Sequence, residues 1–361
     1  MAQQNRKQAW TEGSGHDARG FFSSRSCCAF KAWAVIAALA CGLVFYGTAR
    51  ASDDDKAAAL VRNYRSGLVF FEGKAGKGSG FITDIRGRKY LITNAHVVAA
   101  IKAATFKLLD STPVQVGTPL VAMGHDLVAL AVVEGGVSIP PVASVEKEAE
   151  IGDAVVVLGN AEGAGVVNLL EGKLIGIGPN LVEVDAPFVP GNSGSPIIHV
   201  QSGKVLGVAT YAMVKKTGPR QEKIRRFGFR LDSVQKWQTI DWKRFYAEAD
   251  DLERVKKTTA EFVDLLNDLG RHGRPTHSYD SAAIRGALSA FYVNRSLRPG
   301  SRTASGGGQS LPALLRTASR DDLAGAKTRC GYDFFRRQLD DEERNREEIL
   351  GVFDKMLKSR W

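Results

Sequence analysis

Three residues whose types together hydrolyse amide bonds occur here in contexts that would let them act as one unit. Ser193 lies in the hexapeptide GNSGSP (191–196), where glycines on both sides of the serine permit a cramped turn. His96 follows an apolar strand pattern in TNAHVV, and Asp126 opens another in HDLVALAVV. A serine hydroxyl needs a histidine to take its proton and a carboxylate to orient that histidine. The sequence supplies each of these parts.

The same turn also offers donors for the oxyanion that forms during amide hydrolysis. Backbone N–H groups in a tight glycine-bearing turn usually fill this role, and those of Gly191 and Ser193 can point into one hole. Taken alone, the hexapeptide also fits a hairpin turn, His96 a core histidine, and Asp126 the cap of a turn. The order His, Asp, Ser, with each local context in place, favours catalysis.

The elements that must position these residues are short strands. From about residue 60 to 240, segments rich in Val, Ile and aromatic residues alternate with Gly, Asp and Asn turns. Many short strands with such spacing predict a mainly β protein, a sandwich or barrel rather than βαβ units. The predicted strands are 67–73, 78–85, 89–98, 126–135, 154–160, 181–186, 195–200, 204–212 and 226–231.

After Trp242 the pattern becomes helical. Apolar residues from Leu252 to Leu269 recur at steps of three and four, which predicts an amphipathic helix ended by Gly270 and Pro275. Further helices are expected at 281–294, around 311–339 and at 342–358, with a Gly/Ser-rich linker at about 298–310. The charged run DDEERNREE (340–348) is interpreted as a solvated helix face.

The N-terminal segment carries an export pattern. A basic stretch (1–31) precedes 15 apolar residues (32–46), an A-x-A site (49–51) and three aspartates. The apolar run is shorter than the roughly 20 residues of a membrane span and suits a signal peptide. An uncleaved anchor, with membrane contact through residues 32–49, is the alternative. Both place the protein in the periplasm or cell envelope. The expected domains are 1–51 (signal peptide or anchor), 52–242 (protease) and 243–361 (helical).

Composition excludes several other classes. The formal charge of +10 is basic, yet no basic stripe with interleaved aromatics and no nucleic-acid-binding signature appears, so no nucleic-acid partner is expected. Three of the four cysteines lie within the first 41 residues, which leaves only Cys330 in a processed chain and excludes an internal disulfide framework. No Cys or His pair has metal-site spacing, so neither a metal nor another cofactor is predicted.

The stretch from about 66 to 237 resembles trypsin-fold serine peptidases of the bacterial HtrA-like branch. GSGFITDIRGRKYLITNAHVV (78–98) is similar to that family's histidine segment and HDLVALAVV (125–133) to its aspartate segment. Residues 152–177 and VDAPFVPGNSGSP (184–196) resemble its serine region. The resemblance implies two packed six-stranded antiparallel barrels with the triad in the cleft between them. It assigns Ser193 as nucleophile, His96 as general base and acid, Asp126 as orienting carboxylate, and Gly191 to the oxyanion hole.

The chain also departs from that family. Its relatives usually carry peptide-binding PDZ domains after the protease, and the helical tail lacks their pattern, so trimeric assembly and PDZ gating are not carried over. Pro187 stands where an acidic residue would select Lys or Arg. Phe188, Ala209, Thr210 and Tyr211 suggest a substrate pocket for a small or medium apolar side chain, although each of them also fits plain core.

Two functions follow from these observations. The first is an exported serine endopeptidase that cuts polypeptides through an acyl-enzyme, in envelope quality control or processing. The second is a chaperone-like binding protein in which the protease fold captures unfolded chains without turnover. In either case the C-terminal helices offer a surface for a protein partner or for self-association.

Overall fold

The computed structural model describes residues 52–73, 76–102, 105–160, 166–218, 221–296 and 310–360. The chain divides into two units, Met1–Arg50 and Ala51–Trp361, and the description below concerns the second. The predicted leader or anchor (1–51), its membrane contact (32–49) and nearly all of the linker (298–310) lie outside the described residues. Within the described ranges, no helix combines the length and apolar character that crossing a membrane requires.

The first layer is a seven-stranded antiparallel sheet that carries His96 and Asp126 on the segments between its strands. Its strand order is β13-β5-β6-β3-β2-β1-β4. The strands are β1 (Leu68–Gly73), β2 (Gly76–Ile85), β3 (Arg88–Thr93), β4 (Thr105–Leu108), β5 (Gln115–Ala122), β6 (Val128–Glu134) and β13 (Trp237–Thr239).

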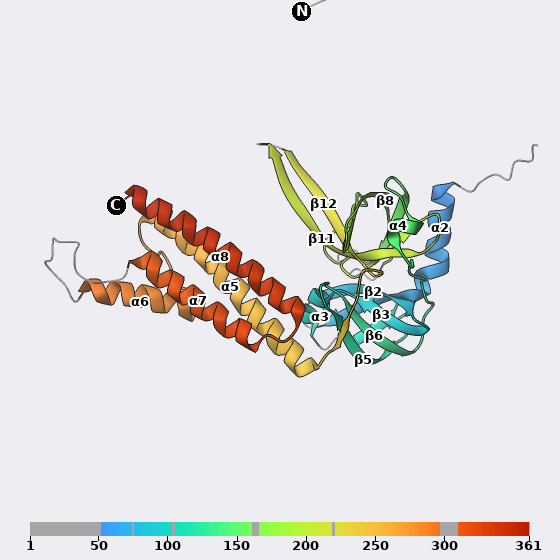
Figure 1. The fold of residues 1–361 in the computed structure, drawn as a ribbon, viewed down its shortest axis with the longest axis horizontal. Coiled ribbons are helices and arrows are strands. Elements are labelled where there is room, and N and C mark those ends of the chain that lie inside the picture. Colours follow the sequence, from blue (N-terminus) through green and yellow to red (C-terminus); the bar gives the residue numbers. More distant parts are fainter. Residues whose placement is uncertain are drawn as a thin grey trace, which may run out of the picture. The chain divides into compact units, whose positions relative to one another are not determined.

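The second layer is a closed barrel of six strands that carries Ser193. It comprises β7 (Ala154–Gly159), β8 (Asn168–Ile177), β9 (Leu181–Val184), β10 (Pro196–His199), β11 (Val205–Gly218) and β12 (Gln221–Arg230). Alternating burial along β9 marks its inner face, which lies in the barrel core. Strands β7 and β10 are buried on both faces, because one face lies in the barrel core and the other packs with residues of the first sheet. Strands β11 and β12 continue beyond the barrel as a long hairpin (Figure 1).

The predicted fold class, mainly β in a trypsin-like arrangement with helices at the C-terminus, is confirmed. In detail, the first sheet has one strand more than the resemblance implies, because the short strand β13 pairs with β5. Strands β4, β5, β8 and β13 are additional to the predicted segments. Hairpin β11–β12 is also longer than predicted.

Three helices lie where strands or loops were expected, one of them the single turn α4 (Val145–Glu148). Residues 95–98, predicted as the end of a strand, begin helix α3 (Ala95–Ile101), and His96 lies in its first turn. Asn94 takes an extended N-cap conformation, and the helix then buries Val97, Val98 and Ile101 in the core. That tertiary contact overrides the strand propensity of the valines. Helix α2 (Asp53–Tyr64), also unpredicted, starts at a capping box of Ser52 and Asp55.

The tail consists of helices α5 (Trp242–His272), α6 (Ala282–Ser296), α7 (Leu311–Arg329) and α8 (Asp333–Arg360). Helix α5 continues past the predicted stop at Gly270 and ends at Gly273, which adopts a positive φ of 69°. The predicted helix over 311–339 is broken at residues 330–332. There the buried carboxylate of Glu248 accepts from the N–H groups of Gly331 (2.8 Å) and Tyr332 (3.0 Å).

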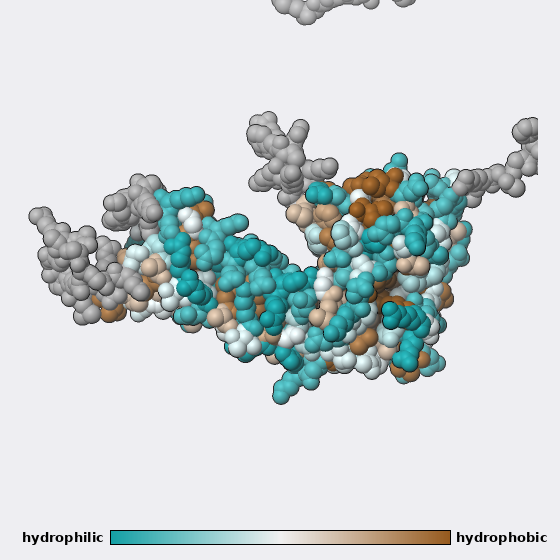
Figure 2. Space-filling model, in the orientation of Figure 1, coloured by the Kyte–Doolittle hydropathy of each residue, from teal (hydrophilic) through white to brown (hydrophobic). Residues whose placement is uncertain are grey.

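The tail shares one hydrophobic core with the first sheet. Phe245 and Val255 of α5 and Phe335 of α8 belong to the same cluster as Val97 and Leu130. Hydrophilic residues cover the visible face of α8 (Figure 2), as the charged run at 340–348 predicts. Arg346, within that run, differs: only 1% of its surface is exposed, because its guanidinium lies between helices. The first sheet, which carries His96 and Asp126, and the tail are therefore packed together.

Candidate active site

His96 and Asp126 form a close pair. His96 Nδ1 lies 2.5 Å from Asp126 Oδ2, and the backbone N–H of His96 donates to Asp126 Oδ1 at 2.9 Å. The first turn of α3 presents the histidine, and the turn between β5 and β6 presents the aspartate. Asn94 secures that turn, because its side-chain amide donates to the Asp126 carbonyl at 2.9 Å. Two bonds to one carboxylate fix both the ring and the backbone of the histidine.

This pairing changes the pKa of His96. Desolvation lowers the pKa, but the charge of Asp126 and the hydrogen bond to its carboxylate outweigh that effect. The pKa of His96 is therefore raised above its ordinary 6.5, and the positive charge of Lys256 on α5 partly opposes the rise. The imidazole is 42% exposed, so it remains accessible from solvent. A histidine held in this way is a stronger base than a free one.

Thr210 makes the third hydrogen bond to the Asp126 carboxylate. Its hydroxyl donates to Asp126 Oδ2 at 3.0 Å, from strand β11 of the barrel. The bond therefore joins the barrel to the turn that carries Asp126. The sequence placed Thr210 in a substrate pocket. The structure gives its side chain this contact with Asp126, in the candidate catalytic pair.

The turn that carries Ser193 is fastened to the first sheet by Ser79 of β2. The Ser79 hydroxyl donates to the Gly191 carbonyl at 2.9 Å, and its backbone N–H donates to the Ser193 carbonyl at 3.3 Å. Ser79 in turn accepts from Thr93 at its carbonyl (2.8 Å). Ser79 belongs to the GSGF segment of the sequence. Its role in holding the Ser193 turn could not be predicted, because no spacing rule connects it to a turn more than a hundred residues away.

Gly194 explains how closely the turn approaches β2. A Cβ at this position would lie 1.9 Å from the Ser79 carbonyl oxygen, and the residue has a φ of +90°. Both facts require glycine. The neighbouring Asn192 is buried, and its Oδ1 accepts from the Val189 N–H at 3.0 Å. The turn is thus held by its own side chain on one side and by β2 on the other.

Ser193 is not engaged with His96 in this structure. Its hydroxyl donates to the Thr210 carbonyl at 3.1 Å. The N–H groups of Gly191 and Ser193 donate to no protein acceptor within the described part of the chain, so both are available to an oxyanion. The structure therefore brings His96, Asp126 and Thr210 together and places Ser193 against the backbone of Thr210.

The remaining predicted pocket residues are dispersed. Phe188 and Ala209 are buried in the barrel core, and the Phe188 carbonyl accepts from the guanidinium of Arg226 at 2.9 Å. Tyr211 is 38% exposed and stacks on Phe227 with ring centroids 5.1 Å apart. Of these side chains, only Tyr211 is presented to solvent.

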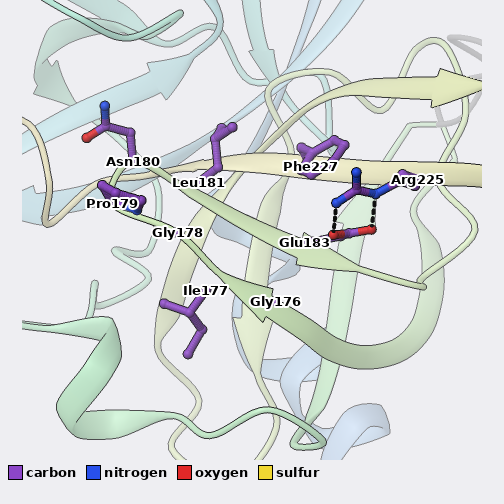
Figure 3. A pocket seen from close by; sticks show the side chains of 9 residues that line it. All are labelled: Gly176, Ile177, Gly178, Pro179, Asn180, Leu181, Glu183, Arg225 and Phe227. Atoms are coloured by element: carbon purple, nitrogen blue, oxygen red, sulfur yellow. Dashed lines mark hydrogen bonds and ion pairs between the residues drawn. The ribbon is translucent and has the colours of Figure 1, made fainter.

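A separate pocket of about 430 Å³ lies on the barrel between the β8–β9 turn and β12. Figure 3 shows its walls, where Arg225 forms a two-bond pair with Glu183 (2.8 and 2.6 Å). Hydrophobic residues gather on the barrel beside β8 (Figure 2). None of His96, Asp126 and Ser193 lines this pocket. Among the described residues, no group of three His, Cys, Asp or Glu side chains has the arrangement of a metal site.

One family model and three solved structures are similar to parts of this chain. Residues 78–208 match the family model described as the trypsin-like peptidase domain. No curated protein sequence matches the chain. Three solved structures are similar. The inactive form of a serine-to-alanine mutant of Rv3671c from M. tuberculosis H37Rv has 24% identity over 48% of this chain and 85% of that one, with a TM-score of 0.38.

The other two are also distant. The serine endoprotease from Yersinia pestis is 21% identical over 62% of this chain and 69% of that one, with a TM-score of 0.39. Deg5 is 23% identical over 45% and 87%, with a TM-score of 0.37. The family match, which spans all three candidate catalytic residues, and the two-layer β fold define a trypsin-like peptidase domain. Polypeptides are the substrates that such a domain implies.

Proposed function

We propose that the protein is a serine endopeptidase in which Ser193 is the nucleophile, His96 the general base and acid, and Asp126 the orienting carboxylate. The observation that carries the proposal is the His96–Asp126 pair, with two contacts of 2.5 and 2.9 Å, beside a tight turn that bears a serine. A carboxylate on Nδ1 holds the proton there and leaves Nε2 as the basic nitrogen.

Catalysis then proceeds by acyl transfer. The Ser193 hydroxyl exchanges the Thr210 carbonyl for His96 as its acceptor, and its oxygen attacks the peptide carbonyl as the proton moves to His96. The N–H groups of Gly191 and Ser193 stabilise the oxyanion. His96 gives its proton to the leaving amine, and an ester of Ser193 remains. Water, deprotonated by His96, hydrolyses this ester and regenerates the hydroxyl.

We further propose that the enzyme acts in the periplasm or cell envelope, on proteins that need quality control or processing. Support comes from the sequence: the basic stretch, the short apolar run and the A-x-A site that precede the acidic start of α2. N-terminal sequencing of the protein from a membrane-free and a membrane fraction tests cleavage against anchoring. A mature chain that starts near residue 52 favours a removed leader.

One observation favours the alternative, a protease fold that binds polypeptides without cutting them. The Ser193 hydroxyl is bonded to Thr210 rather than to His96, an arrangement that leaves the nucleophile inactive. A binder would retain that arrangement when an unfolded chain is present. An enzyme would abandon it.

Cleavage of casein, with the new chain termini read by mass spectrometry, separates the two functions. Ser193→Ala should abolish cleavage. Ser195→Ala is the matched control, because this second serine of the motif is buried and its hydroxyl has no partner in the described structure. Removing an unpaired hydroxyl is close to neutral, so cleavage should persist. If the wild type, Ser193→Ala and Ser195→Ala all cleaved casein at the same low rate, the cleavage would come from a contaminant. This result would contradict the proposal.

A further inference from the structure

The tail forms hydrogen bonds with the turn that carries Asp126. Gly124, two residues before the aspartate, donates its N–H to Asp333 Oδ2 at 2.8 Å and accepts at its carbonyl from Arg337 Nη1 at 2.8 Å. Arg337 Nε also lies 3.1 Å from Asp333 Oδ2. Both side chains belong to the first two turns of α8. Both backbone polar groups of Gly124 are thus bonded by the tail.

The start of α8 is itself fixed by hydrogen bonds to helix α5 and to Asp241, the residue before α5. Glu248 of α5, which is 4% exposed, accepts from the N–H groups of Gly331 and Tyr332, directly before the helix. The Tyr332 hydroxyl accepts from the N–H of Asp241 at 2.8 Å. These contacts are backbone-directed and mostly buried. The pair of side chains on Gly124 therefore extends from a fixed base rather than from a freely moving surface helix.

Helices α5 and α8 also border the catalytic pair directly. One pocket is lined by Asp126, Tyr211 and Phe229 from the protease and by Phe334, Arg337, Gln338, Asp340, Asp341 and Arg344 from α8. On α5, Lys256 is close enough for its charge to lower the pKa of His96. The tail therefore faces both members of the pair, and Asp333 and Arg337 are its polar contacts with the turn that delivers Asp126.

We propose that Asp333 and Arg337 are positioning residues of the active site, which act on His96 through the Gly124 turn and Asp126. The proposal rests on the endopeptidase function proposed above. Catalytic groups must be held within a fraction of an ångström, and a misplacement of about 1 Å costs roughly a hundredfold in rate. A partly loosened turn should therefore lower kcat about tenfold and leave KM within about twofold.

The test uses the full chain with Asp333→Ala and Arg337→Met, which remove the acceptor and the donors. The controls are Asp341→Ala and Arg344→Met. These two residues lie on the same helix, line the same pocket and pair with each other. For each protein, kcat and KM on a peptide substrate, the pH profile of kcat/KM and the thermal midpoint are measured. Arg337→Lys, which keeps a cation and a donor, should lie between wild type and Arg337→Met.

The pH profile distinguishes positioning from a loss of folded protein. The groups that set the pKa of His96 are Asp126, which raises it, and Lys256, which lowers it. Removing the Arg337 cation by itself would raise that pKa. Loosening Asp126 lowers it. The proposal therefore predicts that the acid limb moves to lower pH in Arg337→Met, whereas a smaller folded fraction would scale the profile without moving it.

We expect a tenfold lower kcat in both Asp333→Ala and Arg337→Met and an acid limb shifted to lower pH in Arg337→Met. The thermal midpoints should stay close to those of the controls. The positioning role would be overturned if Asp333→Ala and Arg337→Met had the kcat of the controls. It would also be overturned if the acid limb of Arg337→Met stayed in place or moved to higher pH. If Arg337→Met does not fold, Arg337→Lys carries the same comparison. An inactive wild type would overturn the endopeptidase function itself. An active wild type whose kcat is unchanged by Asp333→Ala and Arg337→Met would overturn only the positioning role of these two residues.

Discussion

The hydroxyl of Thr210 and the imidazole of His96 share one oxygen of Asp126, Oδ2, at 3.0 and 2.5 Å. Thr210 belongs to the barrel and His96 to the helix that follows β3 in the first sheet. The shared oxygen is therefore a point where the two layers of the protease meet. The Ser193 hydroxyl lies at the same junction, because it donates to the carbonyl of Thr210 at 3.1 Å.

Replacing Thr210 by valine keeps the shape of the side chain but removes the hydroxyl. A hydrogen bond to a charged group contributes about 1.5–3 kcal/mol, so kcat/KM should fall roughly tenfold or more. Thr210→Ser retains the donor and should stay within about threefold of wild type. Steady-state kinetics on a peptide substrate measure both. Equal rates for the valine and serine variants would show that the bond has no role in catalysis.

Activity should depend on pH through His96. The general base is the neutral imidazole, and because the pKa of His96 is raised, the acid limb of kcat/KM should have its midpoint above 6.5. Lys256→Gln removes a charge that opposes the rise, so the limb should move to higher pH. Lys257→Gln is the control, because this lysine pairs with Asp280. Identical profiles for the two lysine variants would contradict this assignment.

The stability of the tail should depend on Arg346. Its buried guanidinium donates to the Val255 carbonyl (2.7 Å), to the Thr259 hydroxyl (2.9 Å) and to Asp322 (3.0 Å). Arg346→Ala removes these three bonds from the buried space between the helices, whereas Asp322 keeps its pair with Arg254, so it should cost about 2–3 kcal/mol in the free energy of unfolding. Arg344→Ala, at an exposed pair, should change it by less than about 0.5 kcal/mol. Urea titrations of the two variants give the comparison.

The protease domain and the tail should unfold together. Phe335 of α8 is 1% exposed, and its ring lies 4.9 Å from that of Phe245 in the core shared with the first sheet. Phe335→Ala should lower the free energy of unfolding by about 3–5 kcal/mol, and Val352→Ala, on the exposed face of α8, by much less.

For both proteins, peptidase activity and the helical circular dichroism should disappear at one urea concentration. Loss of helix at lower urea, with activity retained, would show that the tail folds independently. The shared core also predicts that a chain truncated at residue 245 exposes apolar surface and aggregates rather than remaining an active protease.

Sequence reasoning reached the fold class because its evidence is local. Short apolar segments between turns predict strands, and the three-and-four spacing from Leu252 to Leu269 predicts a helix. The family motifs then supplied the topology. The sequence predicts a strand at α3 because Val97 and Val98 favour strands, whereas their burial in the core that the first sheet shares with the tail makes them helical. The break before α8 depends on Glu248, more than eighty residues away.

Only part of the candidate site could be predicted from the sequence. His96, Asp126 and Ser193 stand in motifs with their own local signature. Ser79, the Thr210 hydroxyl and the tail residues that contact Gly124 act through bonds to backbone or to distant side chains, and no spacing identifies such partners. Arg346 looked like one charge in a solvated run, since burial of a single helical position is decided by the neighbouring helices.

Covalent labelling with a fluorophosphonate shows whether Ser193 is an activated nucleophile. A fluorophosphonate reacts only with a serine whose hydroxyl is activated by its histidine. The wild type and Ser195→Ala should each take up one label, mapped by mass spectrometry to Ser193, and Ser193→Ala and His96→Ala should take up none. A folded wild-type protein that remains unlabelled, or whose label lies on another residue, would contradict the proposed role of Ser193.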